Sequence, residues 1–202
     1  MKRVRKPNNL SIKISPGNKK MGRIPAVSLP PVTVCAPDVP CSEECYALKS
    51  YRMYPNVRQA WNHNFDLLIS DRDKYFSDIE AYLNWKSPRY FRQHVSGDIR
   101  DQDYFKRMKS VARSFPGTSF LAFTKRYDLE FGNMPSNLNI VISMWTGETI
   151  PDTQDLPKAW MQDGSETKIP DVHFICTGLC DSCYKCWHLT EDGPKDVVLM
   201  KH

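Results

Sequence analysis

Seven cysteines in two short groups constrain this chain more than any other feature of its sequence. An odd number of cysteines cannot pair completely in disulfides, and a chain of 202 residues is long enough to bury a core without them. We therefore expect the cysteines to hold metal ions or iron–sulfur clusters. The first group is Cys35, Cys41 and Cys45, and the second is Cys176, Cys180, Cys183 and Cys186.

The division into three and four thiols indicates one open and one closed centre. Four closely spaced thiolates close around one tetrahedral zinc ion or one [4Fe–4S] cluster, whereas three leave one metal position free. A single zinc site built from one Cys-x3-Cys pair and one Cys-x2-Cys pair would leave three cysteines unused. Two iron–sulfur clusters are therefore favoured, with zinc as the alternative and buried, inert thiols as a further alternative for the first group.

Positive charge is concentrated in a basic arm at residues 1–25, which contains all the Lys and Arg residues that precede the first acid, Asp38. We expect the arm to be solvated and to add an edge strand at Leu10–Ile14. It lacks aromatic residues that stack on bases, so only weak contact with nucleic acid is predicted. No apolar run is long enough for a membrane span, which favours a cytoplasmic protein without membrane contact.

Residues 26–202 are expected to form a single α/β domain. Apolar runs predict strands, and amphipathic stretches between them predict helices that begin at Pro55, after Asp71 and before Tyr104. Because the strands look covered on both faces, we expect a partial (β/α) barrel or a mostly parallel sheet with helices. A long irregular insertion at 144–171 and a Cys-rich segment at 176–187 complete the domain. The predicted strands are 32–34, 89–95, 119–124, 138–142 and 172–175.

Reactive side chains follow these strands. Chemistry in α/β folds gathers at the carboxyl ends of parallel strands, so we expect the residues there to meet. Asp98 would accept hydrogen bonds from a cofactor amine, or alternatively cap the next helix. Lys125 or Arg126 would pair with a carboxylate or phosphate. The candidate cofactor-binding residues are Ser96, Gly97, Asp98 and Ser143, and the candidate catalytic residues are Asp98, Lys125 and Arg126.

His94 is expected to have a structural role rather than a catalytic one. Strand alternation places Phe91 and Val95 on one face of the 89–95 strand and Arg92 and His94 on the other. We expect His94 to be a hydrogen-bonded core histidine.

Four motifs resemble those of the phage "gene product 88" family, and together they span about residues 30 to 190. The resemblance implies a phage-encoded protein in the host cytoplasm, whose partner is a small molecule or a host macromolecule. The motifs are Cys35…Cys41-Ser-Glu-Glu-Cys45-Tyr46-Ala47, His94-Val95-Ser96-Gly97-Asp98, Phe120-Leu-Ala-Phe-Thr-Lys125 and Cys180…Cys183…Cys186-Trp187.

More distantly, the chain resembles the radical S-adenosylmethionine (SAM) proteins. In those proteins three cysteines after the first strand bind a [4Fe–4S] cluster that holds SAM, and some carry an auxiliary cluster near the C-terminus. Their SAM-binding turn follows the second strand, where this chain has Ser96-Gly97-Asp98. The usual Cys-x3-Cys-x2-Cys spacing is replaced here by Cys-x5-Cys-x3-Cys. The resemblance therefore implies iron–sulfur binding more directly than SAM as a cofactor.

Three functions are open at this point. The first is a radical SAM-like enzyme with one open [4Fe–4S] cluster and one auxiliary cluster. The second is a non-enzymatic iron–sulfur protein with a structural, redox-sensing or host-interaction role. The third is a zinc-stabilised module that binds nucleic acid through the basic arm.

Overall fold

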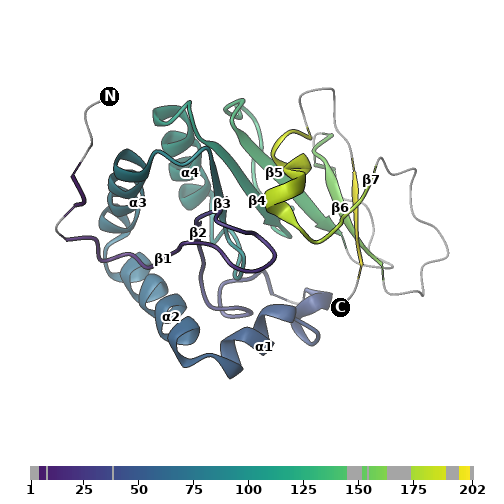
Figure 1. Ribbon diagram of the computed structural model, residues 1–202. Helices are drawn as coiled ribbons and strands as arrows, with labels where there is room; N and C mark the ends of the chain where they lie inside the picture. The colour runs from purple at the N-terminus through teal and green to yellow at the C-terminus, as the bar shows by residue number, and fades with distance from the viewer. Residues whose placement is uncertain are drawn as a thin grey trace.

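The fold is a mixed α/β sheet structure, seen in a computed structural model that describes residues 5–7, 9–37, 39–144, 152–153, 155–162, 174–189 and 196–200. Within these residues eight strands form one open sheet in the order β1-β2-β3-β4-β5-β6-β8-β7 (Figure 1). All neighbours are parallel except β1 and β2. The predicted mostly parallel α/β sheet is therefore confirmed, in its open form. The strands are β1 Ile14–Ser15, β2 Ala26–Val27, β3 Tyr90–Gln93, β4 Ser119–Thr124, β5 Leu138–Met144, β6 Lys158–Gln162, β7 Phe174–Ile175 and β8 Val197–Met200.

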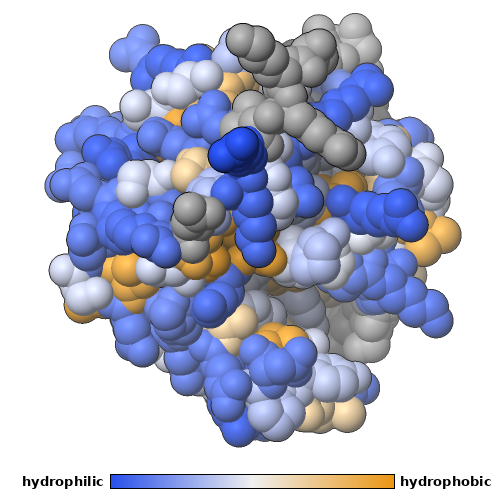
Figure 2. Space-filling model, turned by 60° about the vertical axis from the view of Figure 1, so that its left-hand side comes forward, coloured by the Kyte–Doolittle hydropathy of each residue, from blue (hydrophilic) through white to orange (hydrophobic). Residues whose placement is uncertain are grey.

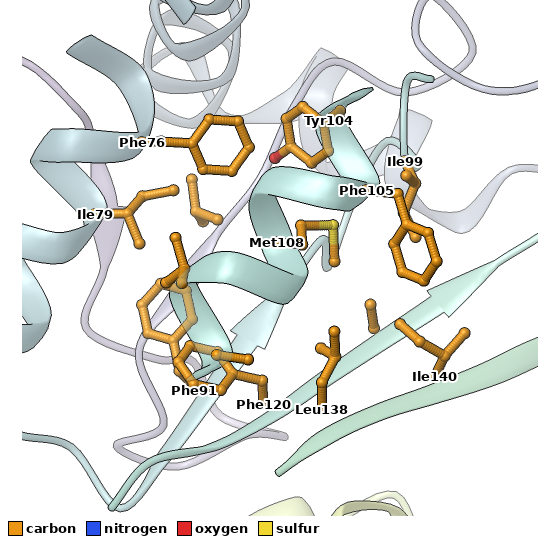
Figure 3. Close-up of a cluster of buried hydrophobic side chains, with 14 of the residues drawn as sticks. Phe76, Ile79, Phe91, Ile99, Tyr104, Phe105, Met108, Phe120, Leu138 and Ile140 are labelled. Atoms are coloured by element: carbon orange, nitrogen blue, oxygen red, sulfur yellow. The ribbon is translucent and has the colours of Figure 1, made fainter. Parts of the chain in front are cut away.

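One face of the sheet is covered by helices that bury its main apolar core. These are α2 Pro55–Ser70, α3 Arg72–Lys86 and α4 Gln102–Ser114, while α1 Tyr46–Met53 packs against α2. Met108 of α4 points toward the sheet, where Phe120 is fully buried, and Tyr104 lies beside Phe76 of α3 (Figure 3). The helix starts follow the sequence, because Pro55 opens α2 and the Asp71 side chain caps α3.

The other face of the sheet is covered by the Cys-rich segment, which contains only the short helices α5 (Cys180–Cys183) and η2 (Lys185–Trp187). In Figure 1 this segment lies in front of the central strands. Trp187 and Leu189 pack there against Leu121 and Val141 of β4 and β5. The second core therefore depends on the segment that carries four of the seven cysteines.

Three sequence predictions need correction. The first core strand is Ala26–Val27, because residues 31–34 form turns and Val32 has a φ of 67°. Residues 158–162, expected to be irregular, form β6, which pairs with β5 and β8. Of the rest of the predicted insertion, Met144 ends β5, and residues 145–151, 154 and 163–171 lie outside the described residues.

The basic arm contributes an edge strand as predicted, although it lies at Ile14–Ser15. Side chains of α2 and α3 hold the preceding residues. Asn64 accepts a hydrogen bond from the Lys13 amide at 2.8 Å and donates to the Lys13 carbonyl at 2.9 Å. The Asp78 carboxylate accepts from the amides of Ser11 and Ile12 at 2.7 and 3.1 Å. This part of the arm is therefore docked on the helices, whereas it was expected to be solvated.

The surface carries little continuous apolar area on the face drawn in Figure 2, where hydrophobic residues form small, separate areas among hydrophilic ones. No helix in the described ranges is long and apolar enough to cross a membrane.

Candidate functional site

The first cysteine group lies beyond the carboxyl end of β2. Cys41 lies in the short helix η1 (Pro40–Ser42), and Cys45 is the N-cap residue of α1. The next residue, Tyr46, donates a hydrogen bond from its hydroxyl to the Val95 carbonyl, which ties α1 to the segment after β3.

Burial shifts the first thiol of this group most. Together with the nearby charge of Asp98 and smaller contributions from Cys45 and Cys41, burial raises the pKa of Cys35 to about 12. Cys35 is therefore a protonated thiol at neutral pH in the protein without metal. A metal that binds Cys35 must displace that proton.

A pocket of about 790 Å³ lies beside Cys35 at the same edge of the sheet. Arg100, Lys125 and Arg126 line it together with Asp101 and Asp128. It is thus a polar pocket of both charge signs next to the three-thiol group. Such a lining suits a small ligand that carries opposite charges.

The turn after β3 is packed into the protein. Gly97 has a φ of 78°, and a Cβ there would lie 2.7 Å from Val34 Cγ2 and 2.8 Å from Leu29 Cβ. Ser96 and Asp98 are 3% and 5% exposed. The residue at Gly97 must therefore be glycine, both for its backbone conformation and for this close approach.

Asp98 braces two strands from inside. Its carboxylate accepts hydrogen bonds from the Thr124 hydroxyl at 2.6 Å and from the Lys125 amide at 2.9 Å, and also from the amide of Ile99. Burial raises its pKa, although these hydrogen bonds oppose the shift. The alternative prediction for Asp98 is wrong, because Asp101 caps α4 by accepting from the Tyr104 amide.

Two predicted catalytic cations are engaged with the protein itself. The Arg126 guanidinium pairs with both carboxylate oxygens of Asp128, at 2.7 and 2.6 Å, and donates to the carbonyls of Ile99 and Arg100. The Lys125 ammonium donates to the Ser143 carbonyl at 2.8 Å. Lys125 and Ser143 are therefore in contact, and the bonds of Lys125 and Arg126 shape the pocket wall.

The second cysteine group follows β7 and returns across the sheet to the arm. The Cys180 amide donates to the Lys20 carbonyl at 2.8 Å. Tyr90 of β3 stacks on Tyr184 with 4.5 Å between ring centroids and meets Trp187 edge-on at 5.6 Å. Burial raises the pKa of Cys186 to about 12, while the positive charge of Arg92 opposes the shift. These thiols thus lie in a largely apolar, aromatic environment.

Arg92 and His94 lie on opposite sides of the sheet, which corrects the prediction that they share a face. Arg92 stands over Phe123, 4.5 Å from the ring centroid, beside the second cysteine group. His94 has a φ of 67°, which breaks the strand alternation, and its ring lies 5.5 Å from that of Tyr104 in the main core. Its ring nitrogens have no hydrogen-bond partner among the described residues, so it is a core histidine without the expected bond.

Arg92 is the residue that the sequence reasoning missed. Strand alternation could have identified it. Because Arg92 follows the buried Phe91 in β3, its side chain must face the layer that covers the other side of the sheet. The residues that form this layer are distant in sequence, so alternation alone did not identify it as cysteine-rich.

The donor set of each group suits an iron–sulfur cluster in type and number, since thiolates are the usual ligands of such clusters. All seven cysteines lie in described residues, and none forms a disulfide. However, no group of three or more His, Cys, Asp or Glu side chains in the described part is arranged to hold a metal ion. For either group to bind a cluster, its thiols must therefore turn toward one another.

Comparison with known proteins identifies a family. No curated protein and no solved structure matches the chain. The model of one protein family, described as Gene product 88, matches residues 3–188. These residues include both cysteine groups, the turn after β3 and the end of β4. The chain therefore belongs to the Gene product 88 family, a family of phage gene products.

Proposed function

We propose that this protein binds two iron–sulfur clusters. Cys35, Cys41 and Cys45 would hold an open [4Fe–4S] cluster, and the second group would hold a closed one. The observation that carries the proposal is the donor set: seven cysteines that form no disulfide fall in two short segments, 35–45 and 176–186. In the second segment Cys176, Cys180 and Cys186 pack against one apolar cluster on the sheet.

The closed cluster would have a structural role. Helices α5 and η2 have four and three residues, which is too short for a helix to be stable by its own hydrogen bonds. Even so, this segment covers the second apolar core of the sheet. Four thiolate ligands to one cluster would fix the segment in place, and the free energy of cluster binding would then add to the stability of the fold.

The open cluster would lie at the pocket beside Cys35. A free iron position next to a pocket with charges of both signs would accept a small ligand that carries an amine and a carboxylate. This supports the radical SAM-like candidate as the finer proposal, in which the chemistry is reductive cleavage of SAM. The residues of this chain would shape the pocket, with Asp98 bracing the strand ends and Lys125 and Arg126 forming one wall.

The first experiment is anaerobic purification followed by analysis of iron, acid-labile sulfide and zinc. Two [4Fe–4S] clusters give about eight irons and about eight sulfides per chain. Replacing the first three cysteines with serine should leave about four irons, and replacing the last four should leave at most about four. Stoichiometric zinc without sulfide would contradict the proposal and support a zinc-stabilised protein.

The second experiment separates an enzyme from a non-enzymatic cluster protein. Reduced, iron-loaded protein is incubated with SAM, and 5′-deoxyadenosine is measured. The triple serine variant at Cys35, Cys41 and Cys45 is the matched control, because it should retain the closed cluster. Formation of 5′-deoxyadenosine by the wild type alone supports the enzyme. No formation by an iron-loaded wild type would limit the protein to a structural, sensing or host-interaction role.

A further inference from the structure

Polar atoms without hydrogen-bond partners concentrate at the carboxyl end of β3. Within the described part of the chain, eight buried side-chain nitrogen and oxygen atoms have no partner, and six of them belong to residues 92–96. Arg92 Nε and Trp187 Nε1 are two of the three atoms among these that can only donate, the third being Gln93 Nε2. A buried donor without an acceptor costs free energy, so both groups require an explanation.

Both donors lie on the side of the sheet that carries the second cysteine group. Arg92 stands over Phe123, and Phe123 packs against the same apolar cluster as Cys176, Cys180 and Cys186. Trp187, which directly follows Cys186, is 2% exposed within that cluster.

The missing hydrogen-bond acceptor for these two donors should be an anionic group with polarisable atoms such as sulfur. The described side chains around this group are mainly aromatic and aliphatic, and none of them accepts a hydrogen bond from Arg92 Nε. A cluster with four thiolate ligands carries net negative charge, and its sulfur atoms accept hydrogen bonds from nearby N–H groups. Such a cluster would supply an acceptor for Arg92 Nε and a counter-charge for its guanidinium.

We propose that Arg92 is a positioning residue for the C-terminal cluster: its Nε–H donates to a cluster sulfur, and its charge favours the reduced state. The proposal rests on the proposed function, since it requires a cluster on Cys176, Cys180, Cys183 and Cys186. It goes further by naming a residue outside the ligand set that sets the reduction potential.

The test compares three full-length variants with the wild type, all purified anaerobically. Arg92→Gln removes the charge, and Arg92→Lys keeps the charge but loses the Nε–H. Arg89→Gln is the matched control, because Arg89 is an exposed arginine just before β3 that lies 5.3 Å from the Tyr90 ring. Iron and sulfide are measured first. Reduction is then followed by electron paramagnetic resonance in a redox titration, with the triple serine variant at Cys35, Cys41 and Cys45 identifying the C-terminal signal.

Loss of the charge in Arg92→Gln should shift the reduction equilibrium of the C-terminal cluster about tenfold toward the oxidised state. For a one-electron couple this is a potential about 59 mV more negative. Arg92→Lys should shift it less and should lose the proton hyperfine coupling that an N–H···S hydrogen bond gives. Arg89→Gln should match the wild type in both measurements.

The outcomes separate the two proposals. A wild type without iron and sulfide overturns the proposed function and this inference with it. If the wild type contains iron and sulfide, and the C-terminal cluster of Arg92→Gln has the same reduction potential as that of the wild type, the role of Arg92 alone is overturned. If Arg92→Gln does not fold, Arg92→Lys decides: identity with the wild type in potential and in hyperfine coupling overturns the role.

Discussion

Asp98 accepts a hydrogen bond of 2.6 Å from the hydroxyl of Thr124, so the turn after β3 is tied to the last residue of β4. Both residues are buried, and the Asp98 carboxylate accepts further hydrogen bonds from the amides of Ile99 and Lys125. The strand ends that border the pocket are therefore held together by one carboxylate. Its first role is to support the pocket rather than to contact a ligand.

Replacing Asp98 with asparagine should lower the free energy of unfolding by about 2 kcal/mol, because an amide NH₂ would face a donor in place of a carboxylate oxygen. Urea denaturation measures the change. Asp103→Asn is the matched control: its side chain is 76% exposed and pairs with Lys106, so a change below about 0.5 kcal/mol is expected. Equal effects of the two substitutions would contradict the bracing role.

Gly97→Ala should destabilise the fold by about 2 kcal/mol or more. The alanine would adopt a left-handed conformation, and its Cβ would collide with Val34 and Leu29. Because Val34 precedes Cys35, the iron content of the first cysteine group should fall as well. Gly117→Ala is the control, since a Cβ there meets nothing within 4 Å. If thermal unfolding shows that both variants have the stability of the wild type, the packing at Gly97 is wrong.

His94 should make the protein less stable in mild acid. Burial and the charge of Arg92 lower its pKa from 6.5 to about 3 in the folded state. Below pH 6.5 the unfolded chain therefore binds a proton that the folded protein does not, and stability falls as pH falls. Between pH 7.5 and 5.5 this loss is about 1.4 kcal/mol.

The measurement for His94 is urea denaturation at both pH values in the wild type and in His94→Asn. Asparagine tolerates the positive φ at this position, so the variant removes the titrating group and keeps the backbone conformation. The variant should lose about 1.4 kcal/mol less than the wild type over this range. An identical pH dependence in the two proteins would show that His94 is not held neutral by the fold.

Long apolar runs made much of the fold predictable. Strands β3, β4 and β5 and helices α2, α3 and α4 follow their apolar periods and their Pro and Asp start signals. Strand β6 was missed because Lys158-Ala-Trp-Met-Gln162 begins and ends with polar residues and contains no β-branched one. It is a strand because it pairs with β5 and β8, and that pairing depends on residues distant in sequence.

The docking of the basic arm was equally hard to predict, since it depends on single polar side chains of α2 and α3. Asn64→Ala would leave the Lys13 amide and the carbonyls of Lys13 and Ser28 without their partner. We expect a loss of about 2 kcal/mol in the free energy of unfolding and faster hydrogen exchange of the Lys13 amide. Asn84→Ala, at an exposed position of α3, should change neither quantity. Unchanged exchange at Lys13 in Asn64→Ala would mean that the arm does not dock through Asn64.

In the candidate site, too, some features were predictable from local sequence and others depended on residues distant in the chain. Sequence reasoning placed Cys35, Asp98 and Lys125 at neighbouring strand ends, and they do lie at one edge of the sheet. It could not predict that both Asp98 and Arg126 form hydrogen bonds within the protein, because their partners come close only after folding. These partners are Thr124 for Asp98, and Asp128 with the carbonyls of Ile99 and Arg100 for Arg126. Arg92 was seen as a strand residue, but the cysteines beside it come from the opposite end of the chain.

The central claim is that the two cysteine groups hold separate iron–sulfur clusters, and the most direct test is a Mössbauer spectrum of the full-length protein produced with ⁵⁷Fe and purified anaerobically. The account predicts the signal of [4Fe–4S] clusters, with one iron site that changes when a small ligand binds at the group of Cys35, Cys41 and Cys45. Protein that carries no iron–sulfide signal, with all seven thiols free or bound to zinc, would contradict it.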